Sequence, residues 1–176
     1  MQPIVIDKFI TKETAEYINN YLRPKAQNHS NPKGFLNLPL NPLNFNSNKD
    51  LESKIVHDLL NLIIDSISSK FGFSKSYLKL DRAFYQVLQE GESLATHADI
   101  LIEVDYSALL YLNDDYEGGE IVFYDRLPFN SNNGTSYKLD KGTLVYFKGD
   151  EKHQHEVKEV ISGERASLIL FYVVNQ

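Results

Sequence analysis

Hydrophobic and polar positions follow two different periods along the chain. In the first third, Ala15, Ile18 and Leu22 recur three and four positions apart, as residues do on one face of an α-helix. Thr11 precedes this stretch and has a side chain that caps helices, whereas Pro24 follows it and cannot continue one. The pattern therefore predicts a helix that starts after Thr11 and ends before Pro24.

A second helical pattern follows, between a capping Asp50 and Gly72. Its apolar positions are Leu51, Ile55, Leu59, Leu62, Ile63 and Ile67. The segment between the two helices, Gln27–Asn48, is rich in Asn and Pro and has no visible period. A loop of this length is either disordered or part of a functional site, and we predict that it is a mobile cover over such a site.

From Asp81 onward, short apolar runs alternate with turn signals, which is typical of an antiparallel sandwich or barrel. The runs are Ala83–Leu88, Tyr106–Leu112, Glu120–Tyr124, Thr143–Phe147, His155–Ile161 and Ala166–Val174. The last run is apolar at nearly every position, so both of its faces must be covered, one by a barrel interior and the other by the helices. We thus predict a single domain over residues 1–176, with helical support in 1–80 and a β core in 81–176.

Composition narrows the possible chemistry. The chain of 176 residues has 42% hydrophobic residues, which is typical of a globular domain, and contains no cysteine. Any metal must therefore be held by His, Asp and Glu. The net charge of −6 disfavours a nucleic-acid partner. No apolar stretch reaches the roughly 18 residues of a membrane span, and the N-terminal sequence lacks the pattern of a secretory signal, so we expect no membrane partner and a cytoplasmic location.

A metal site is indicated by His97 and Asp99, which are separated by one residue and so share one face of a strand. A further His from a distant strand would complete two nitrogens and one oxygen on one side of a metal, the facial triad of non-haem Fe(II) oxygenases. Both His153 and His155 are candidates, because they share a face. Taken alone, His97 and Asp99 are also typical of a surface pair at a strand end.

Four further elements follow this pair in order along the chain. They are Tyr111-Leu112-Asn113, Gly118-Gly119-Glu120, His155-Glu156-Val157 and Gly163-Glu164-Arg165-Ala166-Ser167. The ordered set resembles the prolyl 4-hydroxylase type of Fe(II)/2-oxoglutarate-dependent dioxygenases over about half of the chain. The resemblance implies a mainly β fold, a double-stranded β-helix (jelly roll) flanked by N-terminal α-helices.

The resemblance also implies roles for individual residues. His97, Asp99 and His155 would be the iron ligands, since the family places Glu-Val directly after its last ligand. Arg165 would pair with the distal carboxylate of 2-oxoglutarate, because a guanidinium presents a planar, permanently charged fork. Tyr111 would donate a hydrogen bond to the same carboxylate, and Ser167 would add a second contact. Fe(II), 2-oxoglutarate and O2 are then required, with ascorbate as a further candidate.

Alternation on the last strand supports the placement of Arg165. It places Arg165, Ser167, Ile169 and Phe171 on one face and Ala166, Leu168 and Leu170 on the other. An Arg in a charged turn is also typical of a surface ion pair, here with Glu164 or Glu156. Asp114 and Asp115 lack the spacing of a calcium loop and indicate a solvated turn.

The predicted activity is hydroxylation of a C–H bond, namely prolyl 4-hydroxylation of a proline-containing peptide or protein, with release of succinate and CO2. Two features differ from relatives. Leu94 stands where peptide-modifying relatives often have tyrosine, and Phe171 stands where nucleic-acid demethylases have a second arginine. Two alternatives stay open: the same chemistry on a free amino acid or small metabolite, and a jelly roll that binds a partner without turnover.

Overall fold

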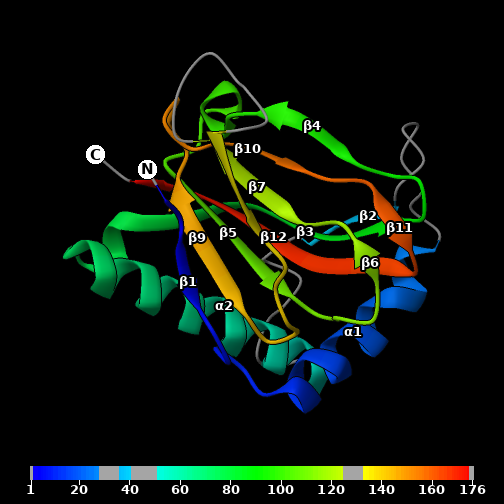
Figure 1. Ribbon diagram of the computed structural model, residues 1–176. Coiled ribbons are helices and arrows are strands. Elements are labelled where there is room, and N and C mark those ends of the chain that lie inside the picture. The colour runs from blue at the N-terminus through cyan, green and yellow to red at the C-terminus, as the bar shows by residue number, and fades with distance from the viewer. Residues whose placement is uncertain (1, 28–35, 41–50, 125–132, 175–176) are drawn as a thin grey trace.

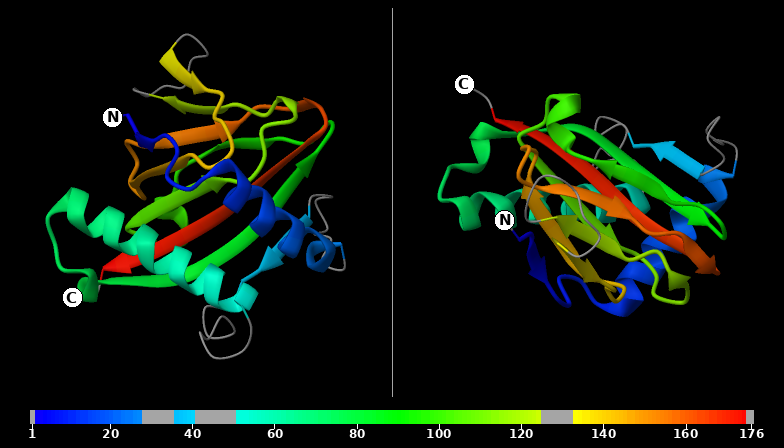
Figure 2. Two further views of the ribbon diagram at one scale, coloured as in Figure 1. Left: turned by 90° about the horizontal axis from the view of Figure 1, so that it is seen from below. Right: turned by 45° about the horizontal axis from the view of Figure 1, so that its top comes forward.

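Two β-sheets face each other in the computed structural model, and two helices cover the outer face of the larger sheet (Figures 1 and 2). The structure describes residues 2–27, 36–40, 51–124 and 133–174. The helices are α1 (Lys12–Ala26) and α2 (Leu51–Phe71), with short 3-10 helices at Lys75–Tyr77 and Asp99–Ile102. The strands are β1 (Ile4–Ile6), β2 (Leu36–Pro39), β3 (Leu78–Gln89), β4 (Leu94–His97), β5 (Tyr106–Tyr111), β6 (Glu117–Gly118), β7 (Ile121–Tyr124), β8 (Gly134–Tyr137), β9 (Leu144–Lys148), β10 (Gln154–Val157), β11 (Val160–Ser162) and β12 (Glu164–Val174).

Strand order confirms the predicted jelly roll. The larger sheet has the order β1-β9-β5-β12-β3-β2, the smaller one has β4-β10-β7-β8, and β11 pairs with β6. All of these pairings are antiparallel. Because strands distant in sequence become neighbours, residues from the second half of the chain converge on the space between the two sheets.

The longest pairing is between β12 and β3, and β5 flanks β12 on its other edge. On the outer face of β12, Ala166, Leu168 and Leu170 are buried in the main core. That core also contains Ala15, Ile18 and Leu22 of α1 together with apolar residues of α2. The opposite face of β12 points between the sheets, so the two-sided burial that the sequence predicts is confirmed.

The N-terminal helix begins as predicted but ends later. The Thr11 side chain accepts a hydrogen bond from the Thr14 backbone N–H at 3.2 Å and caps α1. The predicted end before Pro24 is wrong, because α1 continues to Ala26 with Pro24 inside it. Pro24 removes one backbone donor, but Ala26 is fully buried in the core, and this packing extends the helix by a further turn.

Two further boundaries differ from the sequence-based expectation. Within Gln27–Asn48, the part that the structure describes contains β2, whose Leu36 and Leu38 are buried, as is Leu40 after it. This part is therefore sheet rather than a mobile cover, and the remainder of the predicted cover lies outside the described residues, as does the Asp50 cap. The predicted strand His155–Ile161 is two strands, since β10 pairs with β4 and β7 whereas β11 pairs with β6.

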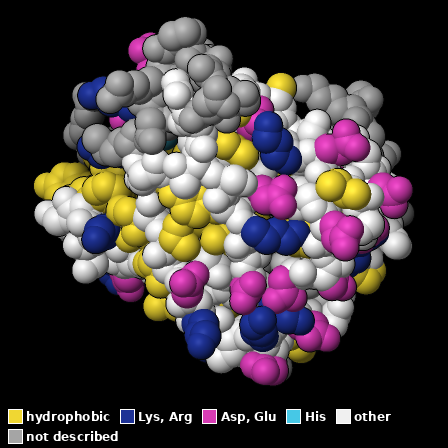
Figure 3. All heavy atoms as spheres, in the orientation of Figure 1, with side chains coloured by type: hydrophobic (Ala, Val, Ile, Leu, Met, Phe, Trp, Pro, Cys, Tyr) yellow, Lys and Arg dark blue, Asp and Glu magenta, His cyan; other side chains and the backbone are white. Residues whose placement is uncertain are grey.

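Surface charge is mixed on the face that Figure 3 shows, where acidic and basic side chains lie close to one another. Two ion pairs of this kind are Lys12 with Asp114, at 3.1 Å, and Lys158 with Glu156. Asp114, for which the sequence analysis expected a solvated turn, thus forms an ion pair with Lys12. None of the helices that the structure describes is long and apolar enough to span a lipid bilayer.

Packing between β12 and the helices gives a first testable prediction. Leu168 is fully buried in the main core, so Leu168→Ala should lower the free energy of unfolding by about 3 kcal/mol through lost burial and a residual cavity. Ile161 is 63% exposed, and Ile161→Ala should change it by less than about 0.5 kcal/mol. Urea denaturation followed by circular dichroism measures both. Equal effects of the two variants would contradict the described packing.

Candidate metal centre

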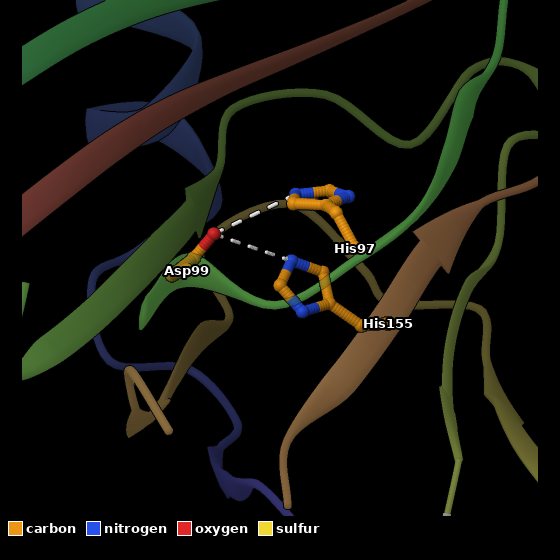
Figure 4. A group of neighbouring side chains, drawn as sticks. All are labelled: His97, Asp99 and His155. Atoms are coloured by element: carbon orange, nitrogen blue, oxygen red, sulfur yellow. Dashed lines mark ion pairs between the residues drawn. The ribbon is translucent and has the colours of Figure 1, made fainter. Parts of the chain in front are cut away.

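Two strands of the smaller sheet bring the predicted triad together. His97 ends β4, Asp99 begins the 3-10 helix that follows, and His155 lies in β10 directly across the ladder from His97. The Nε2 atoms of His97 and His155 lie 3.5 Å and 4.0 Å from Asp99 Oδ1. One ligand atom from each residue falls within 4.8 Å of the other two. Figure 4 shows both rings directed toward the carboxylate, as in a site that holds one ion.

The remaining ring nitrogens define the tautomers. His97 Nδ1 lies 2.8 Å from the Ala95 carbonyl oxygen, and His155 Nδ1 lies 3.0 Å from that of His153. A carbonyl oxygen only accepts, so each Nδ1 carries a proton, and in a neutral ring Nε2 is then the nitrogen that has a free lone pair. Burial lowers the pKa of His155 to about 4, although Asp99 acts in the opposite direction, so this imidazole is neutral at pH 7.

Asp99 is positioned by a serine that the sequence analysis did not identify. Its buried carboxylate accepts a hydrogen bond from Ser107 Oγ to Oδ2 at 2.5 Å, which leaves Oδ1 directed at the two imidazoles. Two imidazole nitrogens and one carboxylate oxygen are a donor set that suits Fe(II). The hydrogen bond from Ser107 therefore fixes the orientation of the Asp99 carboxylate, a candidate metal ligand.

His153 is buried as well but is directed elsewhere. Its Nδ1 lies 2.6 Å from Asp150 Oδ1, and its ring packs against Phe147. Among the described residues, the group that offers a metal site contains His155 and does not contain His153. The structure thus brings together the three residues that the sequence resemblance selected.

A cavity of about 420 Å³ opens beside the triad. Its wall is largely apolar and includes Leu94, Val157, Ile169 and Phe171, and the buried Arg165 also lines it. The cavity is partly open to solvent, since the His97 side chain at its wall is 38% exposed. It has room for a small acid and for part of a larger substrate.

Arg165 is the largest fully buried side chain of the described chain. Its Nη2 donates to the Tyr111 hydroxyl at 2.8 Å and its Nη1 lies 3.5 Å from Ser167 Oγ, whereas its Nε has no partner among the described residues. No carboxylate of the described residues forms an ion pair with it. A buried guanidinium without a counter-ion is unfavourable, so this site fits an anionic ligand.

The alternative of a surface ion pair for Arg165 is wrong. Glu164 binds Arg23 of α1 through two hydrogen bonds of 2.6 and 3.0 Å. Glu156 is occupied by Thr96, Tyr124 and Lys158. Both carboxylates thus have other partners, and Arg165 points between the sheets.

Asn113 flanks this arginine in a way that sequence reasoning missed. Its Nδ2 donates to the Glu164 carbonyl at 2.6 Å, and its Oδ1 accepts from the Ala166 N–H at 2.7 Å. The side-chain amide therefore continues the ladder beyond the end of β5 and holds the backbone on both sides of Arg165. The available signal was the Tyr-Leu-Asn element, in which this residue had no assigned role.

The surroundings of Gly119 explain why the second position of the Gly-Gly-Glu element is a glycine. Its φ is +65°, a left-handed conformation that favours glycine, and an added Cβ would lie 3.1 Å from both Arg165 Cδ and the Tyr116 ring. A side chain at this position would therefore press on the arginine. Gly119 leaves space for the guanidinium in its buried position.

Comparison with known proteins assigns the family. The sequence model of the 2OG-Fe(II) oxygenase superfamily matches residues 83–173, which contain the triad and Arg165. The chain belongs to this superfamily. Membership confirms the expected Fe(II), 2-oxoglutarate and O2, and it places the protein among the 2-oxoglutarate-dependent oxygenases with a double-stranded β-helix fold.

Several similar proteins are named prolyl hydroxylases. Human prolyl 3-hydroxylase 2 is 38% identical over 72 residues, which are 40% of this chain, and the chain spans only 10% of that protein. A Pseudomonas putida prolyl-4-hydroxylase has a TM-score of 0.76 at 16% identity, over 99% of this chain and 93% of that one. A Trichoplax adhaerens prolyl hydroxylase, solved with a peptide fragment of hypoxia inducible factor, has a TM-score of 0.73 at 16% identity, over 98% and 83%.

The Ser107 contact predicts a change in metal affinity. Asp99→Ala should abolish specific Fe(II) binding, and Ser107→Ala should weaken it by about tenfold or more because the carboxylate loses its orienting hydrogen bond. Anaerobic isothermal titration with Fe(II) measures both, with Ser136→Ala as the exposed serine control. Unchanged affinity in Ser107→Ala would contradict the positioning role.

The two hydrogen bonds between the Asn113 side chain and the backbone beside Arg165 predict a change in cosubstrate affinity. Asn113→Ala removes two hydrogen bonds that fix the backbone around Arg165, so the apparent Kd for 2-oxoglutarate should rise about tenfold while Fe(II) affinity stays within twofold. Asn133→Ala, an exposed asparagine, is the control. Equal losses of metal and cosubstrate binding would indicate general unfolding instead.

Proposed function

We propose that this protein is an Fe(II)- and 2-oxoglutarate-dependent hydroxylase that acts on prolyl residues of a peptide or protein. The observation that carries the proposal is the fully buried Arg165, which lacks a counter-ion and lines the same cavity as the two-histidine, one-carboxylate set. A metal set alone fits many reactions. A metal set beside a buried site for a carboxylate fits an oxygenase that uses 2-oxoglutarate.

In this proposal His97 and His155 bind iron through Nε2 and Asp99 binds it through Oδ1. Their Nδ1–H bonds to backbone carbonyls, and the Ser107 bond to Asp99, hold the three ligands in place. When bound, Fe(II) and 2-oxoglutarate activate O2 for oxidation of a C–H bond, with release of succinate and CO2. The protein contributes ligand geometry, orientation and exclusion of water.

The distal carboxylate of 2-oxoglutarate is assigned to Arg165, with Tyr111 and Ser167 beside it. The guanidinium is already oriented by its bond to Tyr111 Oη, and its unpartnered Nε and the nearby Ser167 hydroxyl provide further donors. Because this site is buried, the ion pair is weakly screened by solvent. Arg165 thus fixes one end of the cosubstrate while the triad lies at the other.

The prolyl substrate is supported by the relatives and by the cavity. Both the matched sequence relatives and several structural neighbours are named prolyl hydroxylases, and the Trichoplax adhaerens protein was solved with a peptide. Apolar side chains such as Phe84 and Phe171 line the cavity and suit an uncharged proline ring. The relatives include prolyl 3- and prolyl 4-hydroxylases, so the predicted C4 position, like the cytoplasmic location, remains part of the proposal.

The deciding experiment measures succinate formation. Protein loaded with Fe(II) without oxygen is exposed to air with 2-oxoglutarate and proline-containing peptides, free proline, or no substrate. Peptide-stimulated succinate, together with a peptide that gains the mass of one oxygen, is the expected result, and fragmentation with hydroxyproline standards assigns the ring carbon. Stimulation by free proline alone would establish the small-metabolite alternative. No succinate from iron-loaded protein would favour the binding module.

The assignment of Arg165 predicts a selective kinetic defect. Arg165→Ala should raise the KM for 2-oxoglutarate by at least about 30-fold, because a buried charged contact is lost. Arg165→Lys keeps the positive charge but lacks the planar pair of donors. Its KM for 2-oxoglutarate should lie between those of Arg165→Ala and the wild type. Fe(II) affinity should change less than twofold in both. An unchanged KM in Arg165→Ala would overturn the cosubstrate assignment.

A further inference from the structure

Gln86 is a buried amide on the cavity side of β3. It is 5% exposed, it lines the cavity beside the triad, and it pairs across the ladder with Ser167 of β12. Antiparallel partners point to the same face of a sheet, so Gln86 and Ser167 both face the interior. Farther along the same face, Phe84 pairs with Ile169, and these two residues continue the apolar wall.

The carbonyl oxygen of Gln86 has no hydrogen-bond partner among the described residues. A buried acceptor left unpaired is costly, and such groups in native proteins are commonly completed by a ligand or by water. The other polar side chains of the cavity wall have roles or partners. They are His97, Asp99 and His155 of the triad, Arg165 at the cosubstrate site, and Thr96, which donates to Glu156.

We infer that Gln86 is a substrate-positioning residue, and that its Oε1 accepts a hydrogen bond from the backbone N–H of the residue that follows the target proline. This inference rests on the proposed function. An amide oxygen only accepts, so its partner must be a donor. A proline residue within a peptide has no N–H of its own, and the nearest backbone donor on its carboxyl side therefore belongs to the next residue.

The surroundings of Gln86 give this contact its selectivity. Phe84, Leu94, Ile169 and Phe171 line the same cavity with apolar atoms, so among them Gln86 is the group that orients a polar main chain. A buried acceptor discriminates against a ligand that brings no donor, because the acceptor then stays desolvated and unpaired. Gln86 thus links the apolar recognition of a proline ring to the recognition of a continuing peptide chain.

A double perturbation tests the contact directly. Wild type and Gln86→Leu are each assayed with an acetylated peptide that contains one proline, and with the same peptide in which an ester replaces the amide after that proline. Each single change should lower kcat/KM for hydroxylation about tenfold. The two changes together should cost no more than either alone, because both remove the same hydrogen bond.

Matched controls separate positioning from folding. Gln89→Leu changes an exposed glutamine of the same strand and should leave kcat/KM within twofold of wild type. In Gln86→Leu, the KM for 2-oxoglutarate and the affinity for Fe(II) should also stay within twofold. A higher KM for 2-oxoglutarate together with a weaker affinity for Fe(II) would indicate a structural role and overturn the inference.

The remaining outcomes are distinct. Additive losses in the double perturbation would show that Gln86 and the peptide N–H act independently, which overturns the inference while the proposed function stands. A loss in Gln86→Leu without any effect of the ester would place the contact on a substrate carbonyl and would also overturn it. If wild-type protein hydroxylates no peptide, the proposed function fails, and the inference fails with it.

Discussion

The arrangement of the sheets and of the candidate site depends on β12, a strand that is buried on both faces. β12 is hydrogen-bonded to β3 and β5, and its alternate side chains are divided between the helix-packed core and the space between the sheets. A shift of one residue would turn Leu168 into the cavity and Arg165 toward the helices, so two independent burial requirements fix the same register. The position of Arg165 thus follows from the packing of the whole larger sheet.

Sequence reasoning predicted this part of the molecule well because its signals are local and repeated. The structure contains the features that the sequence patterns predicted. They are the near-continuous apolar run of β12, the pair His97 and Asp99, and the ordered motif elements within the matched region. The choice of His155 over His153 came from the family resemblance, since periodicity places both side chains inward. The structure separates them by a contact that no period encodes, the bond from His153 to Asp150.

Features that depend on tertiary contacts could not be predicted in the same way. The strands β1, β2, β4 and β8 have only three or four residues each, which is too short for a period, and their partners in the sheets define them. The roles of Ser107 and Asn113 arise from hydrogen bonds to residues on other segments. Gln86 did leave a signal, a polar residue inside the predicted run Ala83–Leu88, but only the unpartnered carbonyl oxygen gives that signal a meaning.

The helical layer takes part in the site although no described residue of α1 or α2 lines the cavity. Arg23 of α1 binds Glu164 through two hydrogen bonds, and Asn113 holds the backbone of Glu164 and Ala166, so the start of β12 is fixed from the helix side and from the loop after β5. Arg165 lies between these two anchors and is fully buried before any ligand arrives. A side chain ordered in advance loses little conformational freedom on binding, so more of the ion-pair energy is available for affinity. The buried and unpaired guanidinium lowers the stability of the free protein, and the surrounding core and anchors offset that cost.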